Sequence, residues 1–247
     1  MLETKDLSKK YCDGPVALNN LNITLLPGKI YCLVGPNGSG KTTTLRLLAS
    51  LIKPTSGHIN YNGTVLSFNN LDFKTQIGYL PERCGFYNRF SGLKNLEFFI
   101  SLFQREFHDI DLSQYLKLLD FEKHLNKPVG TYSYGIRQKL GILRTLSIQP
   151  KILLLDEPLN GLDIESQFAV KQIIKELRNQ QKIILISTHL ISTMEDIFDR
   201  IIILYEGTKI LDMDMAFIRE SIKVNSEFTS IMEFYLFHVQ GVRHENK

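Results

Sequence analysis

A short glycine-rich run limits most strongly what this chain can fold into. Residues 35–42 read Gly-Pro-Asn-Gly-Ser-Gly-Lys-Thr, which satisfies the pattern G-x-x-x-x-G-K-[ST]. The run follows an apolar stretch at 30–34 with the length of a buried strand and precedes a stretch at 42–52 with helical spacing. In that order, backbone N–H groups and a helix N-terminus converge on one anion. The segment therefore predicts a phosphate-binding loop.

Side chains at the end of this loop extend the prediction to a nucleotide with its metal. We expect Lys41 to contact the terminal phosphates and the Thr42 hydroxyl to bind Mg²⁺. The alternative is an ordinary glycine turn, which fits the pattern by chance in about one chain of this size in a hundred. The flanking strand and helix argue against it. The expected nucleotide-binding residues here are Gly35, Pro36, Asn37, Gly38, Ser39, Gly40, Lys41, Thr42 and Thr43.

Two adjacent carboxylates follow a second buried strand. Residues 152–155 are Ile-Leu-Leu-Leu, and Asp156 and Glu157 come directly after them. We expect Asp156 to hold Mg²⁺, through water, and Glu157 to orient or deprotonate an attacking water. Such a base contributes about 10²–10⁴-fold in rate. A solvated acidic pair at a strand end is the alternative interpretation, and the phosphate loop in the same chain argues against it.

The apolar pattern predicts an α/β fold. Continuous apolar runs at 30–34, 152–155, 183–186 and 201–204 are typical of parallel strands covered on both faces. Stretches with helical spacing separate these runs, and the pattern predicts helices over 93–107 and 112–119 with no strand between them. We predict one domain over 1–247. Its core lobe spans 1–84 and 148–205, a helical subdomain spans 85–147, and a C-terminal extension spans 206–247.

Composition excludes several classes of protein. The net charge of +3, from 29 basic and 26 acidic side chains, gives no electrostatic footprint for nucleic acid, so no nucleic-acid partner is expected. Three cysteines without metal-binding spacing predict free thiols in a reducing compartment. The start lacks the apolar stretch of a signal peptide, and no apolar run approaches the roughly 20 residues of a membrane helix. Any membrane role is therefore expected to come from a partner.

The motifs, in order and over nearly the whole chain, resemble the nucleotide-binding domain of ABC transporters. Residues 132–139, Tyr-Ser-Tyr-Gly-Ile-Arg-Gln-Lys, resemble the family signature Leu-Ser-Gly-Gly-Gln with its basic and polar continuation. Residues 159–163 resemble the loop that crosses the family's dimer interface and ends in Asp163. His189 matches the switch histidine, and Tyr11 stands where the family places an aromatic residue that stacks on adenine.

This resemblance implies a P-loop NTPase (RecA-like) core, ATP and Mg²⁺ as cofactors, and ATP hydrolysis. It assigns catalysis to Glu157, His189 and Lys41. Ser133 is also a good helix N-cap, and with Gly135 it would bind the ATP of an opposite protomer at a helix N-terminus. The implied partners are a second ATPase protomer, in a homo- or heterodimer, and an integral membrane permease. The implied location is the inner face of the cell membrane.

Three positions depart from the family pattern. Glu82 stands where most relatives have a glutamine that contacts metal and water, and its carboxylate can still bind Mg²⁺ through oxygen. Tyr134 replaces a signature glycine, and Ile136 replaces the signature glutamine. Similar signatures occur in exporters of drugs, antibiotic peptides and bacteriocins, so export is favoured. A closing helix at 230–241 also resembles these exporters, with its apolar residues expected to pack on the core.

Other functions remain as alternatives. A soluble ABC ATPase could act on ribosomes, DNA or iron–sulfur assembly, although the ribosomal relatives carry tandem domains and the DNA-repair relatives carry long coiled coils. A small-molecule phosphotransferase would share only the phosphate loop. A catalytically silent binding module is disfavoured by the intact Lys41, Asp156, Glu157 and His189. The segment from Glu82 to Arg89 is expected to line the groove that receives the membrane partner.

Overall fold

A six-stranded sheet forms the centre of the molecule. The computed structural model describes residues 1–12, 14–224 and 228–245. The strand order is β10-β9-β3-β8-β7-β6, in which only β10 runs antiparallel to its neighbour. The α/β class and the mostly parallel sheet are therefore confirmed. The strands are β3 (Lys29–Val34), β6 (Ile77–Leu80), β7 (Ile152–Asp156), β8 (Ile183–Ser187), β9 (Arg200–Tyr205) and β10 (Thr208–Asp214).

Side chains alternate between two cores on the faces of this sheet. In β3, Ile30, Cys32 and Val34 join one apolar cluster, whereas Tyr31 and Leu33 join the other. Successive side chains of a strand point to opposite faces, so a strand covered on both faces is a continuous apolar run. This burial explains why the four runs were recognisable in the sequence.

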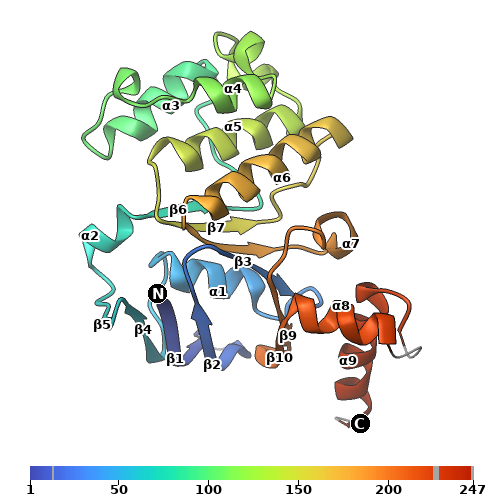
Figure 1. Ribbon diagram of the computed structural model, residues 1–247. Coiled ribbons are helices and arrows are strands. Elements are labelled where there is room, and N and C mark those ends of the chain that lie inside the picture. The colour runs from blue at the N-terminus through green and yellow to red at the C-terminus, as the bar shows by residue number, and fades with distance from the viewer. Residues whose placement is uncertain (13, 225–227, 246–247) are drawn as a thin grey trace.

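A second sheet, which the apolar pattern of the sequence did not predict, packs beside the first. Its order is β2-β1-β4-β5, all antiparallel. The register shifts within β1, and Asp6 and Asn20 have φ of 48° and 46°, so polar and apolar residues do not alternate regularly. This sheet lies at the lower left of Figure 1. Its strands are β1 (Leu2–Lys10), β2 (Val16–Leu25), β4 (Ser56–Tyr61) and β5 (Thr64–Val65).

A helical lobe is inserted between β6 and β7 and lies at the top of Figure 1. Its helix α5 contacts both α3 and β6. The helix expected over 93–107 ends at Ser101, so the prediction was wrong for its last turn and a half. Gln104 takes φ of 56° there, which a continuing helix does not allow. The lobe comprises α3 (Gly92–Ser101), α4 (Ser113–Leu118), α5 (Tyr134–Ser147) and 3-10 turns at Phe107–Asp109, Glu122–His124 and Val129–Thr131.

The remaining helices lie outside the helical lobe, and α8 and α9 follow the last strand. The segment predicted as an extension from 206 begins with β10, a strand of the central sheet. In the last helix, Ile231, Phe234 and Val239 are buried in the main apolar cluster, as expected for the tail. Within the described ranges, no helix is both long and apolar enough to cross a membrane. These helices are α1 (Lys41–Leu48), α2 (Leu71–Lys74), α6 (Ile164–Asn179), α7 (Ile191–Met194), α8 (Met215–Val224) and α9 (Ile231–Glu245).

Candidate nucleotide site

The glycine loop joins β3 to α1 and has a backbone that only glycine accepts easily. Gly40 has φ of 102°, and a Cβ built on it would lie 2.6 Å from the carbonyl oxygen of Ala17. Gly38 has φ of 81° and would have open space around a Cβ. Glycine is thus required at 40 by both the left-handed φ and the close carbonyl, and at 38 by the left-handed φ alone. The resulting turn presents the N-terminus of α1 to the cavity beside it.

Lys41 folds back over this loop. Its Nζ donates hydrogen bonds to the carbonyl oxygens of Gly35 at 2.8 Å and Pro36 at 3.1 Å. Burial lowers the pKa of the Lys41 ammonium, and the nearby carboxylates of Glu157 and Asp156 oppose that change. A partly desolvated cation held above the helix N-terminus is suited to bind phosphate oxygens.

Asp156 is anchored at the end of β7 by two hydroxyl groups. Thr42 Oγ1 donates to its Oδ2 at 2.8 Å, and Ser187 Oγ donates to its Oδ1. Asp156 is 2% exposed. A hydroxyl and a carboxylate that meet in this way fit Mg²⁺, which takes few protein oxygens and completes its shell with water and phosphate. Among the described residues no group of three or more His, Cys, Asp or Glu side chains could hold a metal by itself.

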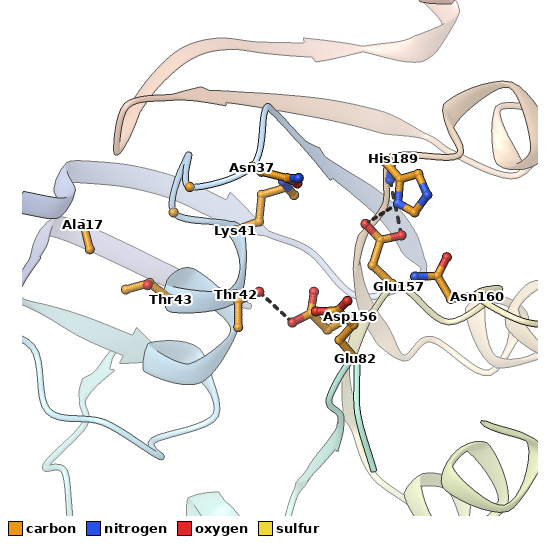
Figure 2. Close-up of a pocket in the computed structure, with 12 residues that line it drawn as sticks. Ala17, Asn37, Lys41, Thr42, Thr43, Glu82, Asp156, Glu157, Asn160 and His189 are labelled. Atoms are coloured by element: carbon orange, nitrogen blue, oxygen red, sulfur yellow. Dashed lines mark hydrogen bonds and ion pairs between the residues drawn. The ribbon is translucent and has the colours of Figure 1, made fainter. Parts of the chain in front are cut away.

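The side chains of Glu157 and His189 are in direct contact at the cavity (Figure 2). His189 Nδ1 lies 2.9 Å from Glu157 Oε1, and the His189 backbone N–H donates to Oε2 at 3.3 Å. The Glu157 side chain is 11% exposed and that of His189 is 61% exposed. Glu157 has φ of 51°, an unusual conformation for a residue other than glycine. Its carboxylate is therefore held at a fixed place, paired with an imidazole that solvent can reach.

These groups surround one cavity of about 680 Å³, here called the nucleotide cavity. Figure 2 shows the Thr42–Asp156 and Glu157–His189 interactions within it. Ten of its lining residues were singled out from the sequence. Ala17 was not, and Asn160 was named only as part of the loop at 159–163, without a role at this site. The lining residues are Ala17, Asn37, Gly38, Gly40, Lys41, Thr42, Thr43, Glu82, Asp156, Glu157, Asn160 and His189.

Tyr11 lies next to the nucleotide cavity but does not line it. Its hydroxyl is 3.4 Å from Thr43 Oγ1, and the Lys9 ammonium lies 5.3 Å from the centre of its ring. Tyr11 is 42% exposed. Its ring is therefore exposed beside the phosphate loop, and the Lys9 ammonium lies over it.

The predicted signature residues and Asp163 stand at helix starts outside the nucleotide cavity. Ser133 is the N-cap of α5 and accepts a hydrogen bond from Ile136 N at 3.3 Å, as expected from the sequence. Gly135 packs directly against the backbone of Gly161. Asp163 caps α6 by accepting a hydrogen bond from Ser166 N at 2.8 Å. Hydrogen bonds from Ser166 lower the pKa of Asp163.

Gln138 was missed by sequence reasoning, although it touches the site directly. It is 2% exposed, and its Nε2 donates to the carbonyl oxygens of Glu157 at 3.1 Å and Pro158 at 3.2 Å. Only its helix position, four residues after Tyr134, was visible in the sequence. Its contact partners lie about 20 positions further along the chain and could not be inferred.

Comparison with known proteins decides the family. Residues 18–160, more than half of the chain, match the family model described as ABC transporter. The chain belongs to the ABC transporter family. Among curated relatives of this ABC protein, the ATP-binding protein NatA of Bacillus subtilis is 34% identical over 84% of the chain and 87% of NatA. The bacitracin transport ATP-binding protein BcrA of Bacillus licheniformis is 36% identical over 84% of the chain and 67% of BcrA.

Solved structures agree with this assignment. An ATP-binding subunit of an ABC transporter superposes with a TM-score of 0.85 at 26% identity, covering 96% of this chain and 99% of that one. A dimeric ATP-binding cassette in a post-hydrolysis state with ADP and Pi has a TM-score of 0.76 at 26% identity, covering 87% and 99%. This ABC protein is therefore the ATP-binding, ATP-hydrolysing subunit of a transporter, and its fold is that of the P-loop ATPases.

Proposed function

We propose that this ABC protein binds Mg·ATP in the nucleotide cavity and drives transport by closing on a second ATPase protomer. The observation that carries this proposal is the convergence of the phosphate loop, Asp156, Glu157 and His189 around that single cavity. Mg²⁺, when bound, neutralises phosphate charge and orients the terminal phosphoryl group. Thr42 and Asp156 would hold it, and Glu82 lines the same cavity.

Each remaining side chain has a distinct role in the proposed hydrolysis. Lys41 exchanges its bonds to the loop carbonyls for bonds to phosphate oxygens. Glu157 accepts a proton from the attacking water. His189 leaves its contact with Glu157 and donates a hydrogen bond to the terminal phosphate. Tyr11 stacks on adenine. Burial of Glu157 next to a histidine supports this division of work, because a fixed acceptor requires little reorganisation.

Closure of two protomers would complete each site. Ser133 and Gly135 do not line the chain's own nucleotide cavity, although they stand at the exposed start of α5. A helix N-terminus that does not line its own nucleotide cavity is available for the nucleotide of a second copy. The likeness to a dimeric cassette supports the same arrangement. ATP would thereby act as the ligand that selects the closed state, and phosphate release would reopen it.

Dimerisation of a hydrolysis-deficient variant tests this proposal. Glu157→Gln should lower the hydrolysis rate by about 10²–10⁴-fold, because the amide cannot accept the water proton. It should also form a dimer in size-exclusion chromatography with Mg·ATP but not with Mg·ADP. The control is the double variant that adds Lys41→Ala, which should stay monomeric. A Glu157→Gln protein that remains monomeric at saturating Mg·ATP, even with its membrane partner, would refute the proposal.

The membrane partner is proposed to dock in a groove between the core and the helical lobe. A cavity of about 640 Å³ lies there, lined by Leu51, Leu71 and Leu102, which are more than half exposed, and by Phe99 and Arg144 among others. The expected segment from 82 to 89 adjoins this groove, since the ring of Phe86 lies 6.3 Å from that of Phe99. Exposed apolar side chains around a hollow suit an apolar helix of a permease.

Substitution in the groove separates docking from hydrolysis. Leu102→Glu places a charge among the lining side chains, so the permease should no longer co-purify from solubilised membranes while hydrolysis by the chain persists. Phe217→Glu is the control, because Phe217 is 59% exposed on α8, outside the groove. Equal recovery of the permease with both variants would contradict the assignment. Recovery of ribosomes or nucleic acid without any membrane protein would instead favour a soluble ABC ATPase.

Export is the proposed direction of transport, with the chain on the cytoplasmic face of the membrane. The relative named for bacitracin transport supports an antibiotic as the kind of cargo. Inside-out vesicles that contain the chain and its permease should accumulate labelled bacitracin only when ATP is supplied. Vesicles that carry Glu157→Gln should not. Equal uptake by the two kinds of vesicle would argue against this cargo and direction.

A further inference from the structure

Helix α5 carries two polar side chains that reach the loops of the nucleotide cavity. Tyr134 and Gln138 are four residues apart and so share one face of the helix. The Tyr134 hydroxyl donates to the carbonyl oxygen of Glu82 at 3.2 Å. Gln138 Nε2 donates to the carbonyl oxygens of Glu157 and Pro158. One helix is therefore bonded to the backbones of both glutamates in the cavity.

The contact of Gln138 holds a backbone that needs support. Glu157 has φ of 51°, and a residue with a side chain keeps that conformation only where its surroundings fix it. Gln138 is buried and bonds the two successive carbonyls, of Glu157 and Pro158, that follow this strained point. The direction of the Glu157 side chain therefore depends on where α5 lies.

The contact of Tyr134 joins three segments. Its ring covers Gly161 so closely that a Cβ at 161 would overlap it, and its hydroxyl reaches Glu82. Tyr134 is 47% exposed and stands between Ser133 and Gly135, at the turn that would meet a second nucleotide.

We propose that Tyr134 and Gln138 are positioning residues. Through their hydrogen bonds, the position of the first turns of α5 determines the orientation of the Glu82 and Glu157 side chains. This inference rests on the proposed function, because the partner's nucleotide is what would fix that turn. Docking of the turn on the second nucleotide then orients the two carboxylates for hydrolysis. Neither side chain lines the nucleotide cavity, so the effect concerns the catalytic step and not the binding of ATP.

Steady-state hydrolysis by three variants tests the inference. Tyr134→Phe keeps the ring over Gly161 and removes the donor, and should lower kcat by roughly two- to tenfold, the range of one hydrogen bond. Gln138→Met keeps the side-chain length and removes both bonds to the loop of Glu157, and should lower kcat about tenfold or more. KM for ATP should stay within about twofold in both, since the phosphate contacts are intact.

The control is Tyr115→Phe. Tyr115 lies in the same lobe, and its hydroxyl interacts with Gln180, away from the nucleotide cavity. It should keep the wild-type kcat and KM. If Gln138→Met does not fold, as judged by its thermal midpoint, the kcat of Tyr134→Phe alone tests the positioning role.

A Tyr134→Phe protein with wild-type kcat would overturn the inference, as would a rise in KM equal to the fall in kcat. Failure of the proposed function is a separate result. It would appear as a Glu157→Gln protein that neither dimerises nor loses hydrolysis. Glu157→Gln can behave as proposed while Tyr134→Phe remains unaffected, in which case only the positioning role is wrong.

Discussion

Gly40 is a residue of the phosphate loop at which both the backbone conformation and the surroundings require glycine. Its left-handed φ and its closeness to the carbonyl of Ala17 act together, whereas Gly38 has only the left-handed φ. A side chain at 40 must either push β2 away or flatten the loop. Both movements displace the N–H groups that would face phosphate.

We expect Gly40→Ala to lower the free energy of unfolding by about 2–3 kcal/mol and to abolish ATP binding, because strain and overlap add. Gly38→Ala, the matched control, should cost only about 1 kcal/mol, since an added Cβ meets nothing within 4 Å. Urea denaturation and equilibrium binding of a fluorescent ATP analogue measure the two effects. Equal losses in the two variants would show that overlap with Ala17 is unimportant.

The N-cap of helix α6 is a carboxylate, so the stability of this helix start depends on pH. Asp163 caps α6, and hydrogen bonds from Ser166 depress its pKa. The folded chain thus releases this proton at a lower pH than the unfolded chain. The resulting stabilisation is present above the unfolded pKa of about 3.9 and disappears as pH falls through the folded pKa.

Asp163→Asn keeps a good cap without a titrating group. We expect the wild type to be more stable than this variant at neutral pH, because the helix dipole also favours the carboxylate. The difference should shrink as pH falls below about 4. Urea denaturation across this range provides the measurement. A difference that is constant with pH would mean that the charge of Asp163 adds nothing to the cap.

Helix α9 buries one phenylalanine against the core and exposes another. Phe234 is 6% exposed within the main apolar cluster, whereas Phe237 is 61% exposed. Phe234→Ala should lower the free energy of unfolding by about 3–4 kcal/mol, the cost of a large buried cavity. Phe237→Ala should lower it by about 1 kcal/mol at most, because Phe237 is exposed and contributes mainly an edge contact with the ring of Phe228. Thermal unfolding of both variants tests this prediction, and similar midpoints would show that α9 does not stabilise the core.

Strands and loops differed in how well the sequence predicted them, for physical reasons. The central strands were predictable because burial on both faces makes them continuous apolar runs. The antiparallel sheet was not, because bulges near Asp6 and Asn20 interrupt its alternation. The phosphate loop and acidic pair were recognisable from local spacing alone. Gln138, by contrast, acts on Glu157 through packing of α5, which no local pattern records.

At the scale of the whole molecule, the charged and polar side chains of the nucleotide cavity already bond to one another. Lys41 bonds its own loop, Thr42 bonds Asp156, and Glu157 bonds His189. ATP binding would therefore exchange contacts and not simply add them. Stabilisation by Mg·ATP should still follow mass action, about 2.7 kcal/mol at a ligand concentration 100 times Kd. Thermal shift of Glu157→Gln against ATP concentration measures this gain, and a shift that ADP matches without Mg²⁺ would contradict the proposed metal role.

The pairing of β3 with β8 has a consequence for how the chain is made. The phosphate loop follows β3 near the beginning, yet β3 pairs with β8, which ends at Ser187 about three quarters of the way along, and with β9, which ends at Tyr205. Asp156 ends β7, which pairs with β8 over a much shorter separation, and Glu157 follows it directly. During synthesis both pairings need β8, but β7 lies close to it along the chain, whereas β3 must pair with it over a long separation. A nascent chain that ends before β8 would carry the whole phosphate motif and still have no site for ATP.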